Sequence, residues 1–360
     1  MIARKSILKI KPYIPGRPIE EVKRKLRLKQ AIKLASNENA LGPSPQAVQA
    51  IKRALGQINR YPDGDCFYLK QKLARTLGLA EHNLVFGAGS DEIITLAARA
   101  FIERGDEVVI ARPTFLIYEL AARIAGAKIK FVPLKNFRYD LKAIKAAITA
   151  RTKMVFIANP DNPTGTYINA KEVREFMRAL PRGLIVYFDE AYLELVDKND
   201  FPRTLKYLKR YNVIIARTFS KAYGLSGLRI GYGISRPEII EYLNRVRDPF
   251  NVNSLAQAAA LSALDDQRHL ERTRRLLRAG KQYLYRQLKQ LGLSYIESVT
   301  NFILVKVGKT APRIYQALLD QGVIVRDMRG WGLNNFIRVT VGTMPENKKF
   351  IQALKEAKQR

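Results

Sequence analysis

The sequence is poor in cysteine, histidine and long apolar runs, and each scarcity excludes a class of protein. Cys66 is the only cysteine among 360 residues, so no intramolecular disulfide can form and a reducing cytoplasm is the expected location. With only His82 and His269 available, a histidine-rich metal centre is excluded, and we expect no metal. No uninterrupted apolar run approaches the roughly 18 to 20 residues of a membrane span. The charged start, Met1-Ile2-Ala3-Arg4-Lys5, has no apolar segment behind it, so no signal peptide is expected.

Acidic residues are also scarce. The chain has 32 Asp and Glu against 63 Lys and Arg, which gives a formal net charge of +31. Such a balance can indicate a nucleic-acid partner, an acidic membrane surface or anionic small ligands. The basic residues are spread along the chain, with no basic tail and no zinc-finger or RNA-binding signature. We therefore expect a solvated basic surface with no specific nucleic-acid or membrane partner; the alternative is a loose, salt-dependent association with either.

Short apolar runs alternate with helical patterns from Ser44 to about Leu264. The run Leu84-Val85-Phe86 meets a glycine-rich turn, and a helix is predicted from Asp91 through Phe101. Nearly continuous apolar runs separated by helices are typical of buried parallel strands with crossover helices. Further strands are expected at Glu107–Ile110, Lys128–Val132, Met154–Ala158, Leu184–Phe188, Val213–Ala216 and Arg229–Gly233, with a helix at Ala170–Leu180.

The pattern changes near Leu264. Residues 268 to 291 are predicted to form one long amphipathic helix that links two domains. The later runs Asn301–Val307, Val323–Arg326 and Phe336–Val341 suggest a small sheet with helices. We therefore predict an α/β protein with a three-layer α/β/α large domain, built on a mostly parallel sheet, and a small α+β domain. Its expected parts are residues 1–43 (an N-terminal arm and part of the small domain), 44–264 (the large domain) and 265–360 (the small domain).

The segment from Thr218 to Tyr232 carries the clearest chemical signal. Lys221 directly follows an apolar strand pattern, and Arg229 stands after two glycines. An enzyme that uses pyridoxal phosphate needs such an arrangement, because a lysine amine forms a Schiff base with the aldehyde while an arginine and hydroxyls hold the phosphate. Asp189 ends another apolar run, where a carboxylate could keep the cofactor's ring nitrogen protonated; alone, it could equally be capping a turn.

The segment around Lys221 resembles the cofactor-lysine motif of the aspartate-aminotransferase superfamily, the fold type I enzymes of pyridoxal 5′-phosphate. Three further segments agree in order: Ala88-Gly89-Ser90, Asn159-Pro160-Asp161-Asn162-Pro163-Thr164-Gly165 and Asp189-Glu190-Ala191-Tyr192. The resemblance implies that Lys221 holds the cofactor and then acts as general base, with Asp189 and Tyr192 as its catalytic partners. It also implies a phosphate cup of Ala88, Gly89, Ser90, Thr218, Ser220 and Arg229, ring contacts from Phe115, Asn162, Asp189 and Tyr192, and a homodimer in which Tyr61 reaches the neighbouring subunit's cofactor.

Nearly the whole chain is similar to the histidinol-phosphate aminotransferase family. Lys11–Gly16, Leu34–Asn39 and Pro249–Asn253 are typical of that family. Its members exchange an amino group between L-glutamate and imidazole-acetol phosphate in histidine biosynthesis, by a ping-pong mechanism that gives histidinol phosphate and 2-oxoglutarate. The implied substrate-binding residues are Tyr13, Asn39, Asn253, Arg326 and Arg338, of which Arg338 would grip a carboxylate as a bidentate fork.

Three other interpretations stay open at this point. Aromatic amino-acid aminotransferases share nearly every cofactor residue, and the apolar residues within Met328–Leu333 could favour phenylpyruvate-type substrates. A phosphothreonine decarboxylase of the same fold is also compatible with the motifs. A non-catalytic regulator of this fold that binds DNA through its basic surface is the hypothesis from another class; the intact cofactor set and the absence of a helix-turn-helix extension argue against it.

Overall fold

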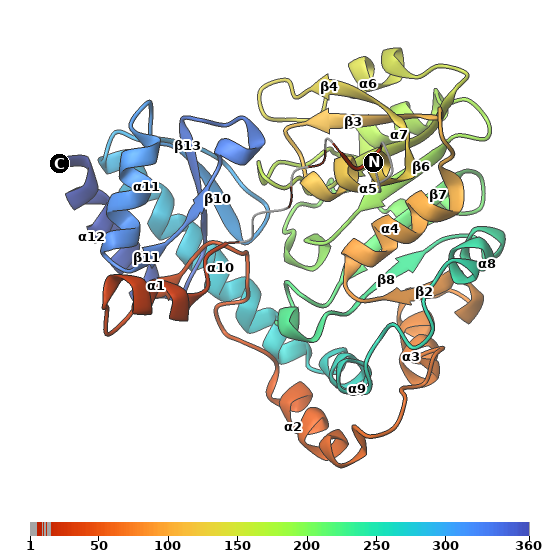
Figure 1. Ribbon diagram of the computed structural model, residues 1–360, viewed down its shortest axis with the longest axis horizontal. Coiled ribbons are helices and arrows are strands. Elements are labelled where there is room, and N and C mark those ends of the chain that lie inside the picture. The colour runs from red at the N-terminus through yellow and green to blue at the C-terminus, as the bar shows by residue number, and fades with distance from the viewer. Residues whose placement is uncertain (1–5, 9, 11, 13–15, 360) are drawn as a thin grey trace.

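The computed structural model describes residues 6–8, 10, 12 and 16–359. These residues form two lobes, with the middle of the chain in one and the C-terminal part in the other (Figure 1). Tyr13, one of the expected substrate residues, lies outside the described residues.

Seven strands form the sheet of the larger lobe, in the order β2-β8-β7-β6-β5-β3-β4. All neighbours pair in parallel except β8, which runs antiparallel to both β2 and β7. Most strand residues are buried on both faces, which explains the nearly continuous apolar runs in the sequence. The strands are β2 (Leu84–Gly87), β3 (Glu107–Arg112), β4 (Lys128–Pro133), β5 (Thr152–Ala158), β6 (Ile185–Asp189), β7 (Asn212–Thr218) and β8 (Gly231–Ile234).

Helices flank this sheet and lie in the connections between its strands (Figure 1). The Ser44 side chain caps the first of them, α2, by accepting the Ala47 N–H at 3.3 Å. The helices are α2 (Pro45–Ala54), α3 (Phe67–Leu77), α4 (Ser90–Phe101), α5 (Leu116–Ala125), α6 (Leu141–Ala147), α7 (Ala170–Arg178), α8 (Pro237–Arg245) and α9 (Ser254–Ala263). Short 3-10 turns lie at η1 (Leu55–Gln57), η2 (Glu81–Asn83), η3 (Leu193–Leu195), η4 (Thr204–Tyr207), η5 (Ser226–Leu228) and η6 (Arg329–Trp331).

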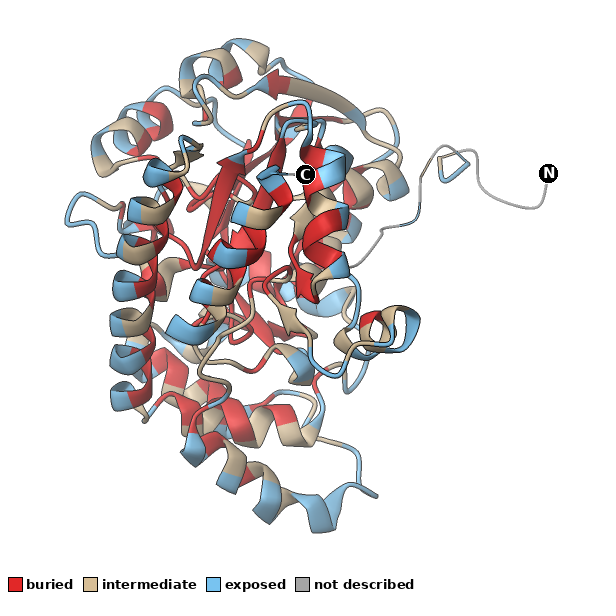
Figure 2. Cartoon of the chain, turned by 90° about the vertical axis from the view of Figure 1, so that its left-hand side faces the viewer, coloured by how far each residue is buried: buried red, intermediate tan, exposed pale blue. Residues whose placement is uncertain are grey.

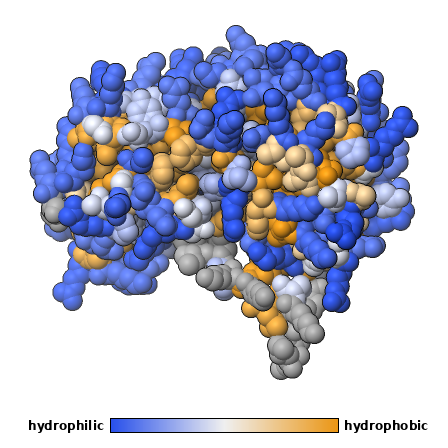
Figure 3. All heavy atoms as spheres, turned by 90° about the horizontal axis from the view of Figure 1, so that it is seen from above, coloured by the Kyte–Doolittle hydropathy of each residue, from blue (hydrophilic) through white to orange (hydrophobic). Residues whose placement is uncertain are grey.

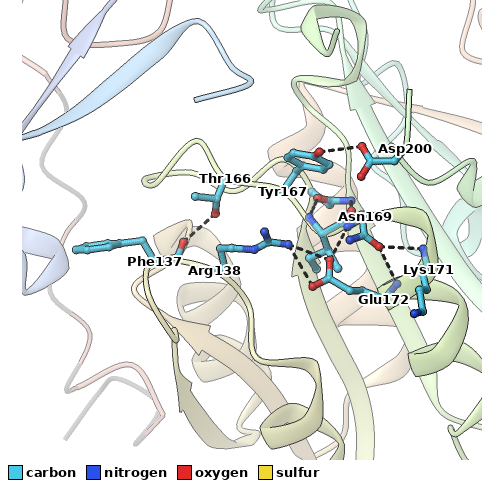
Figure 4. A network of polar contacts seen from close by, with 10 residues as sticks. Phe137, Arg138, Thr166, Tyr167, Asn169, Lys171, Glu172 and Asp200 are labelled. Atoms are coloured by element: carbon cyan, nitrogen blue, oxygen red, sulfur yellow. Dashed lines mark hydrogen bonds and ion pairs between the residues drawn. The ribbon is translucent and has the colours of Figure 1, made fainter. Parts of the chain in front are cut away.

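A network of polar contacts fixes the start of α7 (Figure 4). Asn169 accepts hydrogen bonds from the N–H groups of Lys171 and Glu172, and the Glu172 carboxylate accepts the Asn169 N–H at 2.8 Å. This reciprocal capping box satisfies amides that would otherwise be unpaired at the helix N-terminus. Arg138 bridges to both oxygens of Glu172, at 2.9 and 3.2 Å. The network therefore anchors the chain directly after the loop Asn159–Gly165.

The smaller lobe contains a four-stranded antiparallel sheet in the order β12-β13-β10-β9. The long helix α10 (Gln267–Gln290), predicted for residues 268 to 291, runs into this lobe from the direction of α9 (Figure 1). Its inward face is buried, while its outer turns are exposed (Figure 2). The other elements are β9 (Ser294–Ile296), β10 (Phe302–Lys306), α11 (Ala311–Asp320), β12 (Arg326–Asp327), β13 (Phe336–Thr340) and α12 (Met344–Gln359).

The single strand expected at Val323–Arg326 is wrong, because this segment divides between two sheets. β11 (Val323–Ile324) pairs in parallel with β1 (Ile32–Lys33), and β12 then pairs with β13. The N-terminal segment, including α1 (Ile19–Leu26), consequently packs on the smaller lobe, with Val22 against Leu319 and Ile324. The exact domain boundaries, 43/44 and 264/265, stay a prediction.

The surface of the molecule is largely polar. Seen from above, hydrophilic residues cover most of the visible face and hydrophobic residues gather between them (Figure 3). Within the described part of the chain, no helix is both long and apolar enough to cross a membrane.

Candidate active site

A cavity of about 380 Å³ lies between the lobes, at the carboxyl ends of β5, β6 and β7. Open α/β sheets bind ligands at this edge, and the size is typical of a small-molecule site. The N-terminal segment Ala35–Glu38 and the smaller lobe close the opposite wall. The predicted site residues that line the cavity are Ser90, Phe115, Asn162, Asp189, Tyr192, Thr218, Ser220, Lys221, Arg229, Arg326 and Arg338.

Lys221 follows β7 and points its amine into this cavity. Its Nζ donates a hydrogen bond to the Ser36 carbonyl at 3.4 Å and lies 5.9 Å from the centre of the Tyr192 ring. Burial, helped by the positive charge of Arg338, lowers the pKa of Lys221 from 10.5 to about 8. More of the amine is therefore neutral near physiological pH, which is the nucleophilic form.

Asp189 ends β6 at the floor of the cavity. One carboxylate oxygen accepts the Ala191 N–H at 3.0 Å, and the other accepts the Tyr118 hydroxyl at 2.6 Å. Burial raises the pKa of Asp189 to about 6, although both hydrogen bonds oppose that shift. A buried carboxylate is stabilised by a cationic partner, and a protonated pyridinium nitrogen would be one. Sequence reasoning missed Tyr118. This residue lies about one helical turn after Phe115, which could have indicated that the two side chains share one face of the helix.

The N-terminus of α4 and Arg229 form an anion-binding end of the cavity. The Arg229 Nη1 donates to the Ser220 hydroxyl at 3.3 Å, and its Nη2 donates to the Ala88 carbonyl at 3.5 Å and to Asp91 at 3.3 Å. Free amides at a helix N-terminus, serine hydroxyls and a guanidinium are the groups that hold a phosphate. Ser90, the first residue of α4, lines the cavity here. These residues fit the phosphate of the implied cofactor.

Two constraints explain the glycines at this end: Gly89 has a φ of +84°, and Gly231 lies close to the backbone at the start of α4. A Cβ added to Gly89 would lie 2.3 Å from the Arg229 guanidinium, and one added to Gly231 would lie 2.5 Å from the Ser90 nitrogen. The strand expected from Arg229 in fact begins at Gly231. Arg229 itself has a φ of +55°, a left-handed conformation that takes it out of the strand and allows its side chain to reach the start of α4.

Polar contacts also place the residues expected at the ring of the cofactor. The Asn37 amide donates to the Tyr192 hydroxyl at 2.9 Å, which leaves the hydroxyl proton of Tyr192 for an oxygen in the cavity. Arg338 donates through Nη1 to the Asn162 side-chain oxygen and through Nη2 to the Ala35 carbonyl at 3.1 Å. Asn162 is therefore oriented by a residue from the other lobe. Asn37 was not predicted as a site residue.

A buried carboxylate supports the loop that carries Asn162. Asp161 accepts hydrogen bonds from the hydroxyls of Thr114 and Thr164, each at 2.8 Å, and Thr114 also contacts the Tyr139 hydroxyl at 2.7 Å. Burial raises the pKa of Asp161 to about 6. The loop is thus tied to Thr114 and, through it, to Tyr139, which lie in two other segments, and no local pattern in the sequence indicated this.

Five predicted residues of the described chain lie outside the lining of the cavity: Ala88 and Gly89, directly before Ser90, and Asn39, Tyr61 and Asn253. Asn39 donates to the Ala222 carbonyl at 2.8 Å and to Thr273 at 3.0 Å, so it supports the turn after Lys221. Tyr61 and Asn253 line a second cavity of about 540 Å³ instead. The Tyr61 side chain is 83% exposed and stacks on Phe250 with 4.8 Å between ring centroids. The roles predicted for these residues stay predictions.

Comparison with known proteins agrees with this geometry. A family model described as aminotransferase class I and II matches residues 29–354. This chain belongs to that family. The aminotransferase is 51% identical to a histidinol-phosphate aminotransferase of Moorella thermoacetica, over 98% of this chain and 92% of the relative. It is 48% identical to histidinol-phosphate aminotransferase 1 of Nitrosococcus oceani, over 98% and 96% of the two chains.

A solved structure also resembles the aminotransferase along nearly its whole length. It is a histidinol-phosphate aminotransferase from Sinorhizobium meliloti in complex with pyridoxal 5′-phosphate, with a TM-score of 0.92 and 32% identity over 99% of this chain and 98% of that one. The predicted α/β fold with a mostly parallel sheet is confirmed by this match. Among the described residues, no group of His, Cys, Asp and Glu side chains is arranged to hold a metal ion.

Proposed function

We propose that this aminotransferase is a histidinol-phosphate transaminase that uses pyridoxal 5′-phosphate. It moves an amino group between L-glutamate and imidazole-acetol phosphate, which places it in histidine biosynthesis. The observation that carries the proposal is the pair Arg326 and Arg338, both on the wall of the cavity that contains Lys221. Glutamate has two carboxylates and histidinol phosphate has a phosphate dianion, so each substrate needs cationic partners beside the reactive amine.

The chain's own residues divide the chemistry between them. The start of α4, Ser220 and Arg229 would hold the phosphate of the cofactor, and Asp189 would pair with its ring nitrogen. When bound, pyridoxal phosphate withdraws electrons from the carbon that bears the substrate's amino group, so that this carbon can release its proton. The Lys221 amine would hold the cofactor and, when free, would act as the general base that takes up and returns this proton. Tyr192 and Asn162 would hold the 3-oxygen of the cofactor.

Binding of the substrate's anionic groups falls to the smaller lobe. Arg338 is held by the Ala35 carbonyl and by Asn162, and its place in the cavity lining supports a role as carboxylate or phosphate partner. Arg326 and Tyr13 are the expected phosphate partners. Arg338 also orients Asn162. Binding of a substrate anion to Arg338 is therefore coupled, through Asn162, to the end of the cavity that would hold the cofactor's ring.

We also propose a homodimer in the cytoplasm. Tyr61 and Phe250 are exposed together with Leu55, Ile58, Phe67 and Tyr68. Large exposed hydrophobic residues gathered in one region commonly mark an interface with another protein. In the proposed dimer this surface is covered by the second copy, and Tyr61 contributes to the partner's phosphate site.

A half-reaction tests the proposed function directly. Purified protein loaded with pyridoxal phosphate should convert histidinol phosphate to its ketone without added 2-oxoglutarate, to the extent of one amino group per site. Lys221→Ala should abolish that conversion, and Lys206→Ala, a change at a lysine away from the cavity, should leave it intact. Conversion of glutamate but not of histidinol phosphate would contradict the proposed substrate.

A further inference from the structure

Arg326 and Arg338 are direct neighbours across two paired strands. Arg326 of β12 and Arg338 of β13 are partners in the antiparallel register, and both line the active-site cavity. Like charges directly opposite each other on a sheet repel. The pair therefore needs something beyond the sheet to keep both guanidinium groups aimed at the same space.

Trp331 lies in the connection between these two strands and folds back over both arginines. The Arg326 Cζ lies 5.0 Å from the ring centroid of Trp331, and the Arg338 Cζ lies 5.9 Å from it. The negative face of an indole attracts a cation within about 6 Å, and tryptophan does so best among the aromatic residues. One ring consequently contacts both guanidinium groups, and Arg338 also lies over Phe302, with its Cζ 5.0 Å from that ring centroid.

The indole is itself fixed to the other lobe. Its Nε1 donates a hydrogen bond to the Thr114 carbonyl at 3.0 Å, next to Phe115 of the cofactor end of the site. The side chain is only 7% exposed and packs with Leu304, Met328 and Phe336. The ring plane is therefore set by contacts on both sides of the cleft, and the arginines rest on a rigid surface.

A second cavity lies next to the indole ring of Trp331. It has a volume of about 420 Å³, is lined by Arg112, Phe131 and Gly330 among others, and shares Phe115 and Trp331 with the active-site cavity. The indole is thus part of the wall between the two cavities. If it were shortened, no packed side chain would replace it, and the Arg326 guanidinium could move into the opened volume, away from Arg338, which Asn162 and the Ala35 carbonyl also hold.

We propose that Trp331 is a positioning residue that aligns Arg326 and Arg338 against its indole ring, so that the site selects substrates with a dianion or two anionic groups. This inference rests on the proposed function and deepens it. Trp331 touches neither the cofactor nor the reacting carbon in this proposal; it acts through the arginines. Removing the ring face should therefore affect the anionic part of a substrate and spare the chemistry at the amine.

The test compares histidinol phosphate with histidinol, which lacks the phosphate. In the unaltered protein the ratio of their kcat/KM values measures what the phosphate contributes. Trp331→Leu keeps an apolar side chain but removes the ring face, and we expect that ratio to fall about tenfold. The loss should appear in the KM of histidinol phosphate, with kcat changed little. Trp331→Phe retains a ring under the arginines and should keep the ratio within about threefold of the unaltered value.

Phe336→Leu is the matched control. Phe336 belongs to the same buried cluster and loses a ring of its own, but it does not line the active-site cavity. If Trp331 had a purely structural role, its loss would lower kcat/KM equally for both substrates. The control variant would show the same equal fall. An unchanged ratio in Trp331→Leu, or an equal fall in Trp331→Phe, overturns the proposal.

The two proposals can fail separately. If the unaltered protein prefers histidinol phosphate and Trp331→Leu keeps that preference, only the positioning role is lost. If the unaltered protein does not accept histidinol phosphate, the proposed function fails. The same comparison can then be made with glutamate, which has two carboxylates, and alanine, which has one. Trp331→Leu is expected to lower the ratio of their kcat/KM values about tenfold.

Discussion

The hydroxyl of Tyr118 donates a 2.6 Å hydrogen bond to the carboxylate of Asp189, and both groups are buried. This contact joins the start of α5, which carries Phe115 at its N-terminal end, to the end of β6. It holds one carboxylate oxygen in place and lowers a pKa that burial raises. Tyr118 therefore governs the charge state of the residue proposed to face the cofactor's ring nitrogen.

Tyr118→Phe should weaken cofactor binding. Without the hydroxyl the pKa of Asp189 rises further above 6, so the carboxylate is protonated at a pH where the unaltered protein keeps it charged. We expect the dissociation constant for pyridoxal phosphate to rise about tenfold, as for other residues that orient a primary ligand, and most strongly below neutral pH. Titrations of the cofactor across pH measure this. Equal affinities at all pH values would contradict the role of Tyr118, and Tyr242→Phe on the exposed surface is the control.

Asp189 should also shape the pH dependence of stability in the cofactor-free protein. Its pKa is about 6 when folded, against an ordinary value of 3.8, so the folded state binds its proton more tightly. The free energy of unfolding should therefore decrease as pH rises from about 4 to about 6, by up to about 3 kcal/mol from this group. Asp189→Asn should lose that part of the slope, whereas Asp320→Asn, at an exposed carboxylate, should keep it. Denaturant unfolding on both sides of the window measures the difference.

The side chains that sequence reasoning recovered are those whose position follows from a local pattern. Asp189 and Lys221 stand where apolar strands end, and a parallel sheet brings such ends to one edge. Tyr118, Asn37 and Asp161 were missed because their roles depend on contacts between distant segments. Asn37, for example, meets Tyr192 across 155 residues of chain.

Backbone conformation set a second limit on prediction. Arg229 was placed in a strand because its neighbours are apolar, but its left-handed φ takes it out of the strand and towards the phosphate end. The segment Val323–Arg326 was expected to form one strand for the same reason. In the structure it changes sheets at Val325, which is decided by the partners β1 and β13 rather than by its own residues.

Arg326→Ala should lower kcat/KM for phosphorylated substrates more than for unphosphorylated aromatic ones. Loss of one partner of a charged hydrogen-bonded pair costs about 2 to 5 kcal/mol, so we expect kcat/KM for histidinol phosphate to fall at least about thirtyfold. The value of kcat/KM for phenylalanine should fall far less. Arg329→Ala is a matched control, because Arg329 lies on the same segment and pairs with Asp327 at the surface. Equal losses on both substrates would remove the phosphate role of Arg326.

Shared sites in the proposed dimer predict complementation between two defective variants. Lys221→Ala lacks the amine, and Tyr61→Ala lacks the contribution to the partner's site. A hybrid dimer should contain one site with both defects and one with neither. Mixing the subunits after reversible dissociation should restore about a quarter of the unaltered activity, since half of the dimers are hybrids with one intact site. No gain over the separate variants would contradict the shared site.

The most direct test of the account is a paired measurement of kcat/KM with enzyme in which glutamate has already loaded the amino group. Imidazole-acetol phosphate and phenylpyruvate would be compared as acceptors in moderate salt. The arginine pair beside Lys221 predicts a preference of at least about a hundredfold for the phosphorylated acceptor, because a site built for a charged group rejects a substrate that leaves it unpaired. Comparable or faster use of phenylpyruvate would contradict the proposed substrate and identify an aromatic amino-acid aminotransferase.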